Sequence, residues 1–202
     1  MPRWAPHAPR ILCKFEFFFV NVSRCQQLHT QLSQQSVPHY SHRLAIADDL
    51  PAIVAIYNST IPSRQVTADI EPVTVASRQD WFNEHSADKR PIWVVEANGQ
   101  MLGWLSYSNF HARVAYAHTA EISIYLTQCA RRKGLGAYFL AEAIAFAPML
   151  NIHTLVGLIF GHNEPSLKLF ERFGFERWAN MPRVAILDGV ERDLVIVGKR
   201  VA

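Results

Sequence analysis

Residues 119–136 read TAEISIYLTQCARRKGLG, and they carry the clearest structural signals of the chain. Its first half alternates between two sets of side chains, with Ala120, Ile122, Ile124 and Leu126 on one side of an extended chain and Thr119, Glu121, Ser123 and Tyr125 on the other. Strict alternation over this length is typical of a strand with one buried face. We therefore expect a strand from about His118 to Leu126, with an apolar core face and a polar face that carries Glu121.

The second half of the stretch holds the pattern Arg131-x-x-Gly134-x-Gly136, directly before an amphipathic helix that is expected to extend to about Met149. Glycines allow a sharp turn, and the first amides of the helix have no partners within it, so they can converge on an anion such as a pyrophosphate. A dinucleotide fingerprint would need a third glycine where Phe139 stands, and a P-loop would need Lys-Ser/Thr after Gly136. The alternative is an ordinary glycine turn with solvated basic side chains.

Upstream, the sequence predicts a short strand, two helices and a hairpin. Residues 42–46 alternate as a strand, Asp48 and Asp49 precede Pro51 as the cap of a helix, and a second helix follows over 77–86. Residues 91–96 and 101–107 flank Asn98-Gly99, a pair whose positive φ angles suit a tight hairpin turn. Trp93 and Trp104 in this hairpin are expected to be core residues.

Downstream, residues 154–160 form a continuous apolar run, as in a strand covered on both faces. Asn163-Glu164-Pro165-Ser166 begins a helix that ends near Phe173, with Gly174 as its left-handed cap. Two last strands, near 175–183 and 192–199, flank the turn Asp188-Gly189. The element order is β-α-α-β-β-β-α-β-α-β-β, which indicates an α/β fold with a mixed sheet.

Composition and charge limit the possible functions. The chain has 202 residues, half of them hydrophobic and 18% charged, which suits one globular domain. A net charge of +3 does not suggest a nucleic-acid partner, and no apolar run is long enough to predict a membrane span. Cys13, Cys25 and Cys129 form no disulfide framework or zinc motif, and the nine histidines form no metal constellation. We expect a cytoplasmic protein without a metal site.

The first 41 residues differ in composition from the rest. An apolar piece with Phe15, Phe17 and Phe19 is followed by a segment rich in Gln, Ser and His that ends at Ser41. Such a segment is typical of a linker. We therefore expect residues 1–41 to be an N-terminal extension outside the core and residues 42–202 to form the domain. The alternative is that the three phenylalanines pack onto the domain or a partner.

The glycine loop after a strand that carries Glu121, together with Asn163-Glu164-Pro165-Ser166 and Phe173-Gly174-Phe175, resembles the GNAT superfamily of acyl-CoA-dependent N-acetyltransferases over residues 42–202. More narrowly, Arg113-x-x-Tyr116-x-x-Thr119-Ala120-Glu121-x-Ser123-Ile124-Tyr125 resembles the phosphinothricin and methionine sulfoximine N-acetyltransferases. The resemblance implies a mixed, mostly antiparallel central sheet flanked by helices. It also implies acetyl-CoA as cosubstrate, a small amino-acid-like amine as acceptor, and a homodimer.

The same resemblance implies roles for particular residues. Glu121 would be the general base that takes the proton of the acceptor amine, and a backbone amide near Leu126 would stabilise the oxyanion. Arg113, Tyr116 and Thr119 would line the acceptor site, where the planar fork of Arg113 suits a carboxylate or phosphinate. The residues that would hold the cofactor are Leu126, Arg131, Arg132, Lys133, Gly134, Leu135, Gly136, Ala137, Asn163 and Ser166.

These roles have structural alternatives. Glu121 could be a solvent-facing strand carboxylate, Asn163 only a helix N-cap, and Arg113 a mobile surface side chain. The chain also departs from the superfamily at Phe170, where many members carry a tyrosine, and the phosphinothricin group a histidine, as general acid, so no acid is assigned.

Two other functions stay open on the same fold. One is acetylation of a peptide or polyamine, although the absence of a carboxylate between Phe110 and Ala120 disfavours a polyamine. The other is a non-catalytic CoA-binding module. Glu121 argues against this module, whereas Phe170 is compatible with it.

Overall fold

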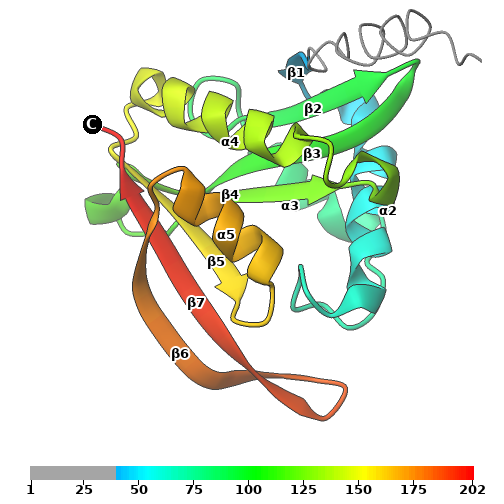
Figure 1. Ribbon diagram of the computed structural model, residues 1–202. Helices are drawn as coiled ribbons and strands as arrows, with labels where there is room; N and C mark the ends of the chain where they lie inside the picture. Colours follow the sequence, from blue (N-terminus) through cyan, green and yellow to red (C-terminus); the bar gives the residue numbers. More distant parts are fainter. Residues whose placement is uncertain (1–39) are drawn as a thin grey trace, which may run out of the picture. The chain divides into compact units, whose positions relative to one another are not determined.

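The computed structural model describes residues 40–202, so the expected N-terminal extension lies outside the described residues except for Tyr40 and Ser41. Seven strands form one sheet in the order β1-β2-β3-β4-β5-β7-β6 (Figure 1). Neighbouring strands are antiparallel except β4 and β5, which are parallel, and this confirms the expected mixed, mostly antiparallel sheet. The strands are β1 His42–Leu44, β2 Ile92–Ala97, β3 Gln100–Asn109, β4 Thr119–Leu126, β5 Thr154–Phe160, β6 Glu176–Leu187 and β7 Val190–Arg200.

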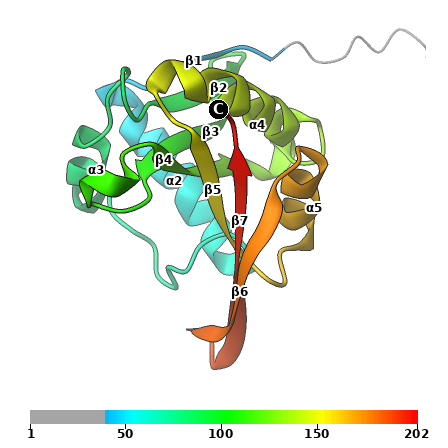
Figure 2. The same cartoon turned by 90° about the vertical axis from the view of Figure 1, so that its left-hand side faces the viewer.

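Helices cover both faces of this sheet, with α4 and α5 on one face and α2 and α3 on the other (Figure 1, Figure 2). In the described part of the chain, the α-helices are α2 Leu50–Thr60, α3 Gln79–Asn83, α4 Leu135–Phe146 and α5 Glu164–Arg172. Short 3-10 turns are η1 Ala47–Asp49, η2 Ile61–Ser63, η3 Ala76–Arg78, η4 Val114–Tyr116, η5 Gln128–Ala130 and η6 Ala147–Leu150. Within residues 40–202, none of the helices combines the length and the apolar character needed to cross a bilayer.

The larger core lies between the sheet and helices α4 and α5. It contains Phe139 and Leu140 from α4, Phe170 from α5 and Tyr107 from β3, and each is nearly or completely buried. The Tyr107 hydroxyl donates to the carbonyl oxygen of Ala143 at 2.8 Å, so the polar end of this buried side chain is satisfied. Burial of a leucine or phenylalanine side chain of this kind contributes about 1.5–3 kcal/mol to folding.

A smaller core on the opposite face joins α2 and α3 to β2 and β3. Ile53 and Ile56 pack against Val94 and Trp104, and the indole Nε1 of Trp104 donates to the carbonyl oxygen of Ile53 at 3.1 Å. Trp93 faces the larger core and Trp104 the smaller one. Both are 3% exposed, which confirms the prediction that they are core residues.

The two hairpin-turn signals and the glycine cap after α5 are confirmed. Asn98 and Gly99 have φ angles of 51° and 75° between β2 and β3, and Asp188 and Gly189 have 49° and 78° between β6 and β7. Only glycine, asparagine and aspartate adopt such angles at little cost. Gly174 follows α5 with a φ of 75°, as expected for its left-handed cap.

Several element boundaries differ from the prediction. α3 spans only five residues after the 3-10 turn η3, instead of the helix expected over 77–86. α4 ends at Phe146, and Pro148 lies in the 3-10 turn that follows, because proline has no amide hydrogen with which to continue the helix. β6 and β7 continue to the Asp188-Gly189 turn. Leu158 is 40% exposed, so β5 is not covered on both faces along its whole length.

Asp49 does not cap α2 as expected. Its side chain bonds none of the first amides of α2 and instead accepts a hydrogen bond from the Ile46 amide at 2.7 Å. It also forms an ion pair with Arg43 at 2.6 Å, and the nearby guanidinium lowers the pKa of this carboxyl. The carboxylate therefore ties β1 to the chain segment that leads into α2.

Candidate active site

β4 and β5 separate in the middle of the sheet. Their parallel pairing covers only Thr119–Thr154, Ala120–Leu155 and Glu121–Val156. Beyond these pairs β4 stays bonded to β3 and β5 stays bonded to β7, so the two strands diverge (Figure 1). The facing edges of residues 122–126 and 157–160 therefore carry backbone N–H and C=O groups that pair with no other described strand. Such an opening can receive an extended ligand that completes these hydrogen bonds.

Glu121 lies at the point where the two strands separate. It is half-buried, on the face of β4 that α2 and its neighbours cover. Among residues 40–202 its carboxylate accepts no hydrogen bond, and burial raises its pKa above that of an ordinary glutamate. In the same described range, no three His, Cys, Asp or Glu side chains cluster as metal ligands. An unpartnered carboxylate beside an opening in the sheet is suited to take a proton from a ligand.

Small polar side chains of β3 lie next to Glu121. Ser108 is directly opposite Glu121, and Ser106 is opposite Ser123, in the antiparallel register of β3 and β4. The following pair on this face is aromatic, since Trp104 is opposite Tyr125 and their rings stack with centroids 4.4 Å apart. This stacked aromatic pair therefore closes one end of the polar patch.

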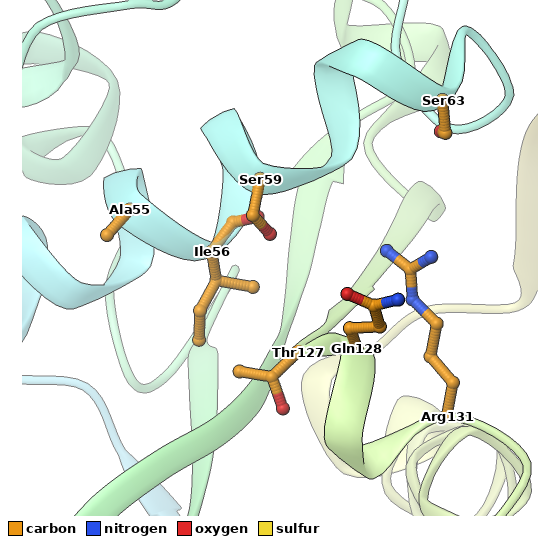
Figure 3. A pocket seen from close by; sticks show the side chains of 7 residues that line it. All are labelled: Ala55, Ile56, Ser59, Ser63, Thr127, Gln128 and Arg131. Atoms are coloured by element: carbon orange, nitrogen blue, oxygen red, sulfur yellow. The ribbon is translucent and has the colours of Figure 1, made fainter.

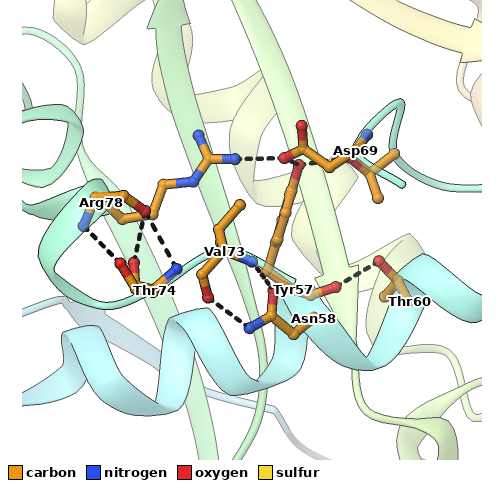
Figure 4. Close-up of polar contacts among 9 residues, drawn as sticks. Tyr57, Asn58, Thr60, Asp69, Val73, Thr74 and Arg78 are labelled. Carbon is orange, nitrogen blue, oxygen red and sulfur yellow. Dashed lines mark hydrogen bonds and ion pairs between the residues drawn. The ribbon is translucent and has the colours of Figure 1, made fainter. Parts of the chain in front are cut away.

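Tyr57 of α2 contacts both this aromatic pair and the loop that follows the helix, and Figure 4 shows its polar contacts with the loop. The Tyr57 ring lies 5.1 Å from the Tyr125 ring, and its hydroxyl donates to the carboxylate of Asp69. Nη2 of Arg78 donates to the same carboxylate at 2.7 Å, and the guanidinium carbon lies 4.8 Å from the centre of the Tyr57 ring. Burial raises the pKa of Tyr57, so this hydroxyl keeps its proton. These contacts hold the loop of residues 64–76 against α2.

The loop between β4 and α4 presents a series of backbone amides. Arg132 and Gly134 have φ angles of 59° and 88°, and α4 begins at Leu135. Within the described residues, the amides of residues 132–137 donate to no acceptor, because they precede α4 or belong to its first turn. Alternating left-handed conformations turn such amides toward one concave side, where the positive end of the helix dipole also attracts an anion.

The side chains of this glycine loop point in different directions. Leu135 is completely buried in the larger core, so only its amide can reach a ligand. Gly136 lies close to α5 and β4, since a Cβ there would be 3.2 Å from Leu169 and 3.7 Å from Leu126. Of the other residues predicted here, Arg131 and Ala137 are half-buried, and Arg132, Lys133 and Gly134 are exposed. The predicted cofactor residues 126 and 131–137 are thus brought together at the open end of β4.

A pocket of about 470 Å³ lies between the glycine loop and α2 (Figure 3). The guanidinium of Arg131 and the amide of Gln128 extend from the loop toward the helix. The remaining lining residues are Thr127 from the loop and Ala55, Ile56, Ser59 and Ser63 from α2 and η2. A cationic group among hydroxyl and amide groups suits a polar, anionic ligand.

Asn163 and Ser166 lie at the start of α5, just after β5. Asn163 is 6% exposed, and its Oδ1 accepts a hydrogen bond from the Ser166 amide at 3.3 Å. Its Nδ2 donates to the carbonyl oxygen of Gln65 at 3.0 Å, so both ends of the side chain are used within the protein. The expected N-cap is confirmed. The Ser166 hydroxyl is half-buried and bonds no other described residue.

The three predicted acceptor residues occupy two different environments. Thr119 begins β4 on the same face as Glu121, two residues before it. Arg113 and Tyr116 lie in the exposed loop before β4, where the Tyr116 ring contacts the rings of Phe110 and His111. Arg90, which is buried, donates from Nη2 to the carbonyl oxygen of Ala117 at 2.8 Å and so anchors the end of this loop.

Phe170 lies in the larger core. Its ring packs on Phe175 with centroids 4.8 Å apart, and Gly157 of β5 is so close that a Cβ there would be 2.8 Å from it. A hydrocarbon ring in this position supplies no proton. No general acid can be assigned to residue 170.

Sequence reasoning missed several neighbours of Glu121. A signal for the serines was present, since Trp104, Ser106 and Ser108 alternate along the second hairpin strand and polar side chains at this period indicate a face that is not wholly apolar. No local pattern could have predicted that Tyr57 and Arg78 lie near this site. They belong to α2 and η3, and they meet only in the folded chain.

Comparison with known proteins adds independent information. The family model of the acetyltransferase (GNAT) domain matches residues 43–176. The chain is 51% identical over 161 residues to the "Putative phosphinothricin acetyltransferase YwnH" of Bacillus subtilis, which covers 79% of this chain and 98% of that protein. It is 35% identical over 150 residues to the L-methionine sulfoximine/L-methionine sulfone acetyltransferase of Pseudomonas aeruginosa, which covers 74% of this chain and 87% of that protein.

The fold has a matching solved structure. The GNAT superfamily phosphinothricin acetyltransferase of Sinorhizobium meliloti in complex with acetyl-CoA has a TM-score of 0.76 at 27% identity, and the match covers 80% of this chain and 88% of that one. The family model spans β1 to the start of β6, including the opening between β4 and β5 and the glycine loop. Because sequence and architecture agree over this length, the chain belongs to the GNAT family of acetyltransferases.

Proposed function

We propose that this protein transfers the acetyl group of acetyl-CoA to the amino group of a small amino-acid-like substrate of the phosphinothricin or methionine sulfoximine type. The observation that carries the proposal is the position of Glu121, a carboxylate with a raised pKa and no partner among the described residues, at the mouth of the opening between β4 and β5. The names of the two relatives above give phosphinothricin and methionine sulfoximine as substrates, which supports this class of acceptor.

Glu121 is the proposed general base. An amine attacks a thioester only after it has lost a proton, and a carboxylate whose pKa is raised by burial is a stronger base than a solvated one. Its place on β4 lets it take the proton directly or through a water molecule. Phe170 supplies no general acid, and a thiolate leaves without strong protonation, so the proposal assigns none.

Acetyl-CoA supplies the activated acetyl group, as a thioester. The unpaired amides of residues 132–137 fit its pyrophosphate, and the open edge of β4 up to Leu126 fits the amide groups of its pantetheine arm. Arg131, Arg132 and Lys133 add positive charge, whereas Gly134, Leu135, Gly136 and Ala137 contribute amides. A backbone amide near Leu126 is our candidate for stabilising negative charge on the carbonyl oxygen. Asn163 shapes the start of α5, where Ser166 offers its hydroxyl.

Arg113, Tyr116 and Thr119 are the proposed acceptor-binding residues. The Arg113 guanidinium forms no ion pair within residues 40–202, so it is available to a carboxylate or phosphinate. Its planar fork can donate two parallel hydrogen bonds to such a group. Thr119 offers a hydroxyl between this loop and Glu121.

Three further proposals concern the whole protein. Residues 1–41 act as an extension and residues 42–202 as the catalytic domain, which is supported by the start of the family match at residue 43. The enzyme forms a homodimer, for which the exposed apolar side chains of β6, Trp178, Met181, Val184 and Ile186, offer a surface. It works in the cytoplasm, where acetyl-CoA is available.

One assay tests the proposed reaction. Thiol release from acetyl-CoA is measured with phosphinothricin, methionine sulfoximine, a peptide with a free N-terminus and spermidine. We expect kcat/KM for one of the amino-acid analogues to exceed that for the peptide and spermidine by at least about 100-fold, because a site built around fixed hydrogen-bond donors rejects ligands that leave them unpaired. Acetylation of the peptide alone would refute the acceptor class. CoA binding without thiol release for any amine would instead support the non-catalytic module.

A further inference from the structure

His85 lies in the segment between α3 and β2, within hydrogen-bond distance of Ser108, the residue opposite the candidate base. Its Nδ1 is 2.6 Å from the carbonyl oxygen of Trp81, and its ring centroid lies 4.7 Å from that of the Trp81 ring. A carbonyl oxygen only accepts hydrogen bonds, so Nδ1 carries the hydrogen. Burial lowers the pKa of His85, so the ring is neutral at neutral pH and Nε2 carries a free lone pair.

Ser108 connects His85 to Glu121. Its Oγ lies 3.4 Å from Nε2 of His85, and because this nitrogen is an acceptor, the hydroxyl is the donor. Ser108 is also directly opposite Glu121 on the neighbouring strand, where Cβ atoms of paired residues are about 4.5–5.5 Å apart. Among the described residues the hydroxyl is directed to Nε2 and forms no hydrogen bond with Glu121, and it has one hydrogen to give.

We propose that His85 is a positioning residue for the base, because by holding the hydrogen of Ser108 it keeps that hydroxyl from donating to Glu121. This rests on the proposed function, in which Glu121 takes the proton of the acceptor amine. In the absence of Nε2 the hydroxyl has no acceptor on that side and is free to turn to the carboxylate on the neighbouring strand. Once Glu121 is protonated, its O–H can donate to a free lone pair of Ser108, so one arrangement serves both states of the base.

The hydrogen bond that His85 prevents would weaken the base. A bond donated to a carboxylate stabilises its charged form and lowers its pKa, by about one unit for a bond of ordinary strength. The other ionisable groups of the surrounding segments are Glu84 and Arg90 near His85, and Tyr57, Asp69, Arg78 and Tyr125 on the Glu121 side. The variants below change none of these groups.

Two substitutions of His85 separate this role from packing. In His85→Asn the side-chain amide can still donate to the Trp81 carbonyl, but no atom replaces Nε2. In His85→Gln the side-chain oxygen can replace Nε2 as acceptor. We expect the acid limb of kcat/KM against pH to move about one unit lower in His85→Asn, with kcat reduced roughly 3- to 10-fold at neutral pH and the KM for acetyl-CoA unchanged. His85→Gln should keep the acid limb of the wild type.

Removal of the competing hydroxyl gives the sharpest test. Ser108→Ala alone should leave the acid limb in place, because the hydroxyl does not donate to Glu121 in the wild type either. In the double variant His85→Asn/Ser108→Ala the acid limb should return to the wild-type position. If His85 had only a structural role, the two substitutions would lower kcat/KM additively, and the acid limb of the pH profile would keep its wild-type position. His153→Ala, which removes an imidazole stacked on His118, controls for the loss of a packed ring.

Several outcomes would overturn the proposal. The proposal is contradicted if the acid limb of the pH profile lies at the same pH in His85→Asn and in the wild type. It is also contradicted if the acid limb of the double variant stays at the lower pH of His85→Asn. Nitrogen NMR of the unmodified protein provides a test that needs no variant, because an Nε2–H tautomer of His85 at pH 7 would exclude the arrangement. Failure of the proposed function looks different: Glu121→Gln then keeps wild-type turnover, whatever the His85 variants do.

Discussion

The glycine loop before α4 and the Glu121 face of β4 hold their polar groups in different ways. In the loop the groups are backbone amides of residues 132–137, directed by the left-handed conformations of Arg132 and Gly134. Around Glu121 of β4 the groups are side chains that come from distant segments, such as Ser108 of β3 and His85 before β2.

This difference predicts which kind of substitution impairs each region. A site made of backbone amides tolerates most side-chain changes but depends on the conformation of its glycines. A site made of side chains depends on single atoms, whereas the backbone around it is held by the ladder hydrogen bonds of the sheet. Substitutions in the two regions should therefore affect different steps, with cofactor binding sensitive to the loop and proton transfer sensitive to β4.

Glu121→Gln should produce the largest effect. It preserves shape and removes basicity, so kcat should fall by about 10²–10⁴, and the loss should shrink at high pH, where more of the amine is already unprotonated. Steady-state rates across pH measure both effects. Wild-type turnover at neutral pH would leave Glu121 as an ordinary strand residue.

The same variant tests the burial of this carboxyl. Because the folded protein raises the pKa of Glu121, it binds this proton more tightly than the unfolded chain does. Ionisation of Glu121 therefore costs stability at pH values above its unfolded pKa, and the cost disappears as pH falls below that value. Glu121→Gln should thus melt at the same or a higher temperature than the wild type at pH 7. A clear drop in melting temperature would contradict the raised pKa.

Gly134→Val should disrupt the loop. The φ angle of 88° is one that valine rarely adopts, so the chain must rearrange and the amides no longer converge. The Kd for CoA should rise about 100-fold, as expected for the loss of two charge-assisted hydrogen bonds, and calorimetry measures it. Gly189→Val is the matched control, with a φ of 78° and equally open space in the β6–β7 turn. It should lower stability without changing CoA affinity.

Arg113→Lys should have a smaller effect, confined to binding of the acceptor substrate. The substitution keeps the charge and loses the planar fork, so the KM for methionine sulfoximine should rise about 10-fold while the KM for acetyl-CoA stays constant. Arg183→Lys, an exposed arginine of β6, serves as control. Equal KM values in Arg113→Lys and the wild type would remove Arg113 from the acceptor site.

Deletion of residues 1–38 should have the smallest effect, leaving activity and melting temperature nearly unchanged. Deletion through residue 42 should cost more, because the Tyr40 hydroxyl donates to the Lys133 carbonyl at 2.8 Å and the His42 ring stacks 4.2 Å from Trp93. We expect the longer deletion to lower the melting temperature by about 2–8 °C, for a loss of one to two kcal/mol. A large drop already in the shorter deletion would favour packing of the N-terminal phenylalanines onto the domain.

Much of the fold could be predicted where the signal lies within a few residues. The alternation from Thr119 to Leu126 was enough to predict β4 and its two faces. The dipeptides Asn98-Gly99 and Asp188-Gly189 were enough to predict the hairpin turns. The spacing of Gly134 and Gly136 was enough to predict a loop with unpaired amides. These features depend on local backbone geometry, which neighbouring residues set.

The prediction was less accurate where a distant contact competes with a local preference. Asp49 has the chemistry of a helix cap but bonds Arg43 and the Ile46 amide instead, and Leu158 belongs to an apolar run but is exposed on one face of β5. Local pattern describes what a side chain prefers. The partner that it meets depends on the strand or helix that packs beside it.

The strand, the glycine loop and, through their resemblance to a known family, the class of reaction can be inferred from the amino-acid sequence. The surroundings of Glu121 arise from the folded chain: the early end of the pairing of β4 with β5, Ser108 and Ser106 on the facing strand β3, and His85 behind Ser108. The register between strands and the burial of a carboxylate arise from the packing of the whole sheet against its helices. Because these contacts join residues far apart in the chain, no periodicity in the sequence can reveal them.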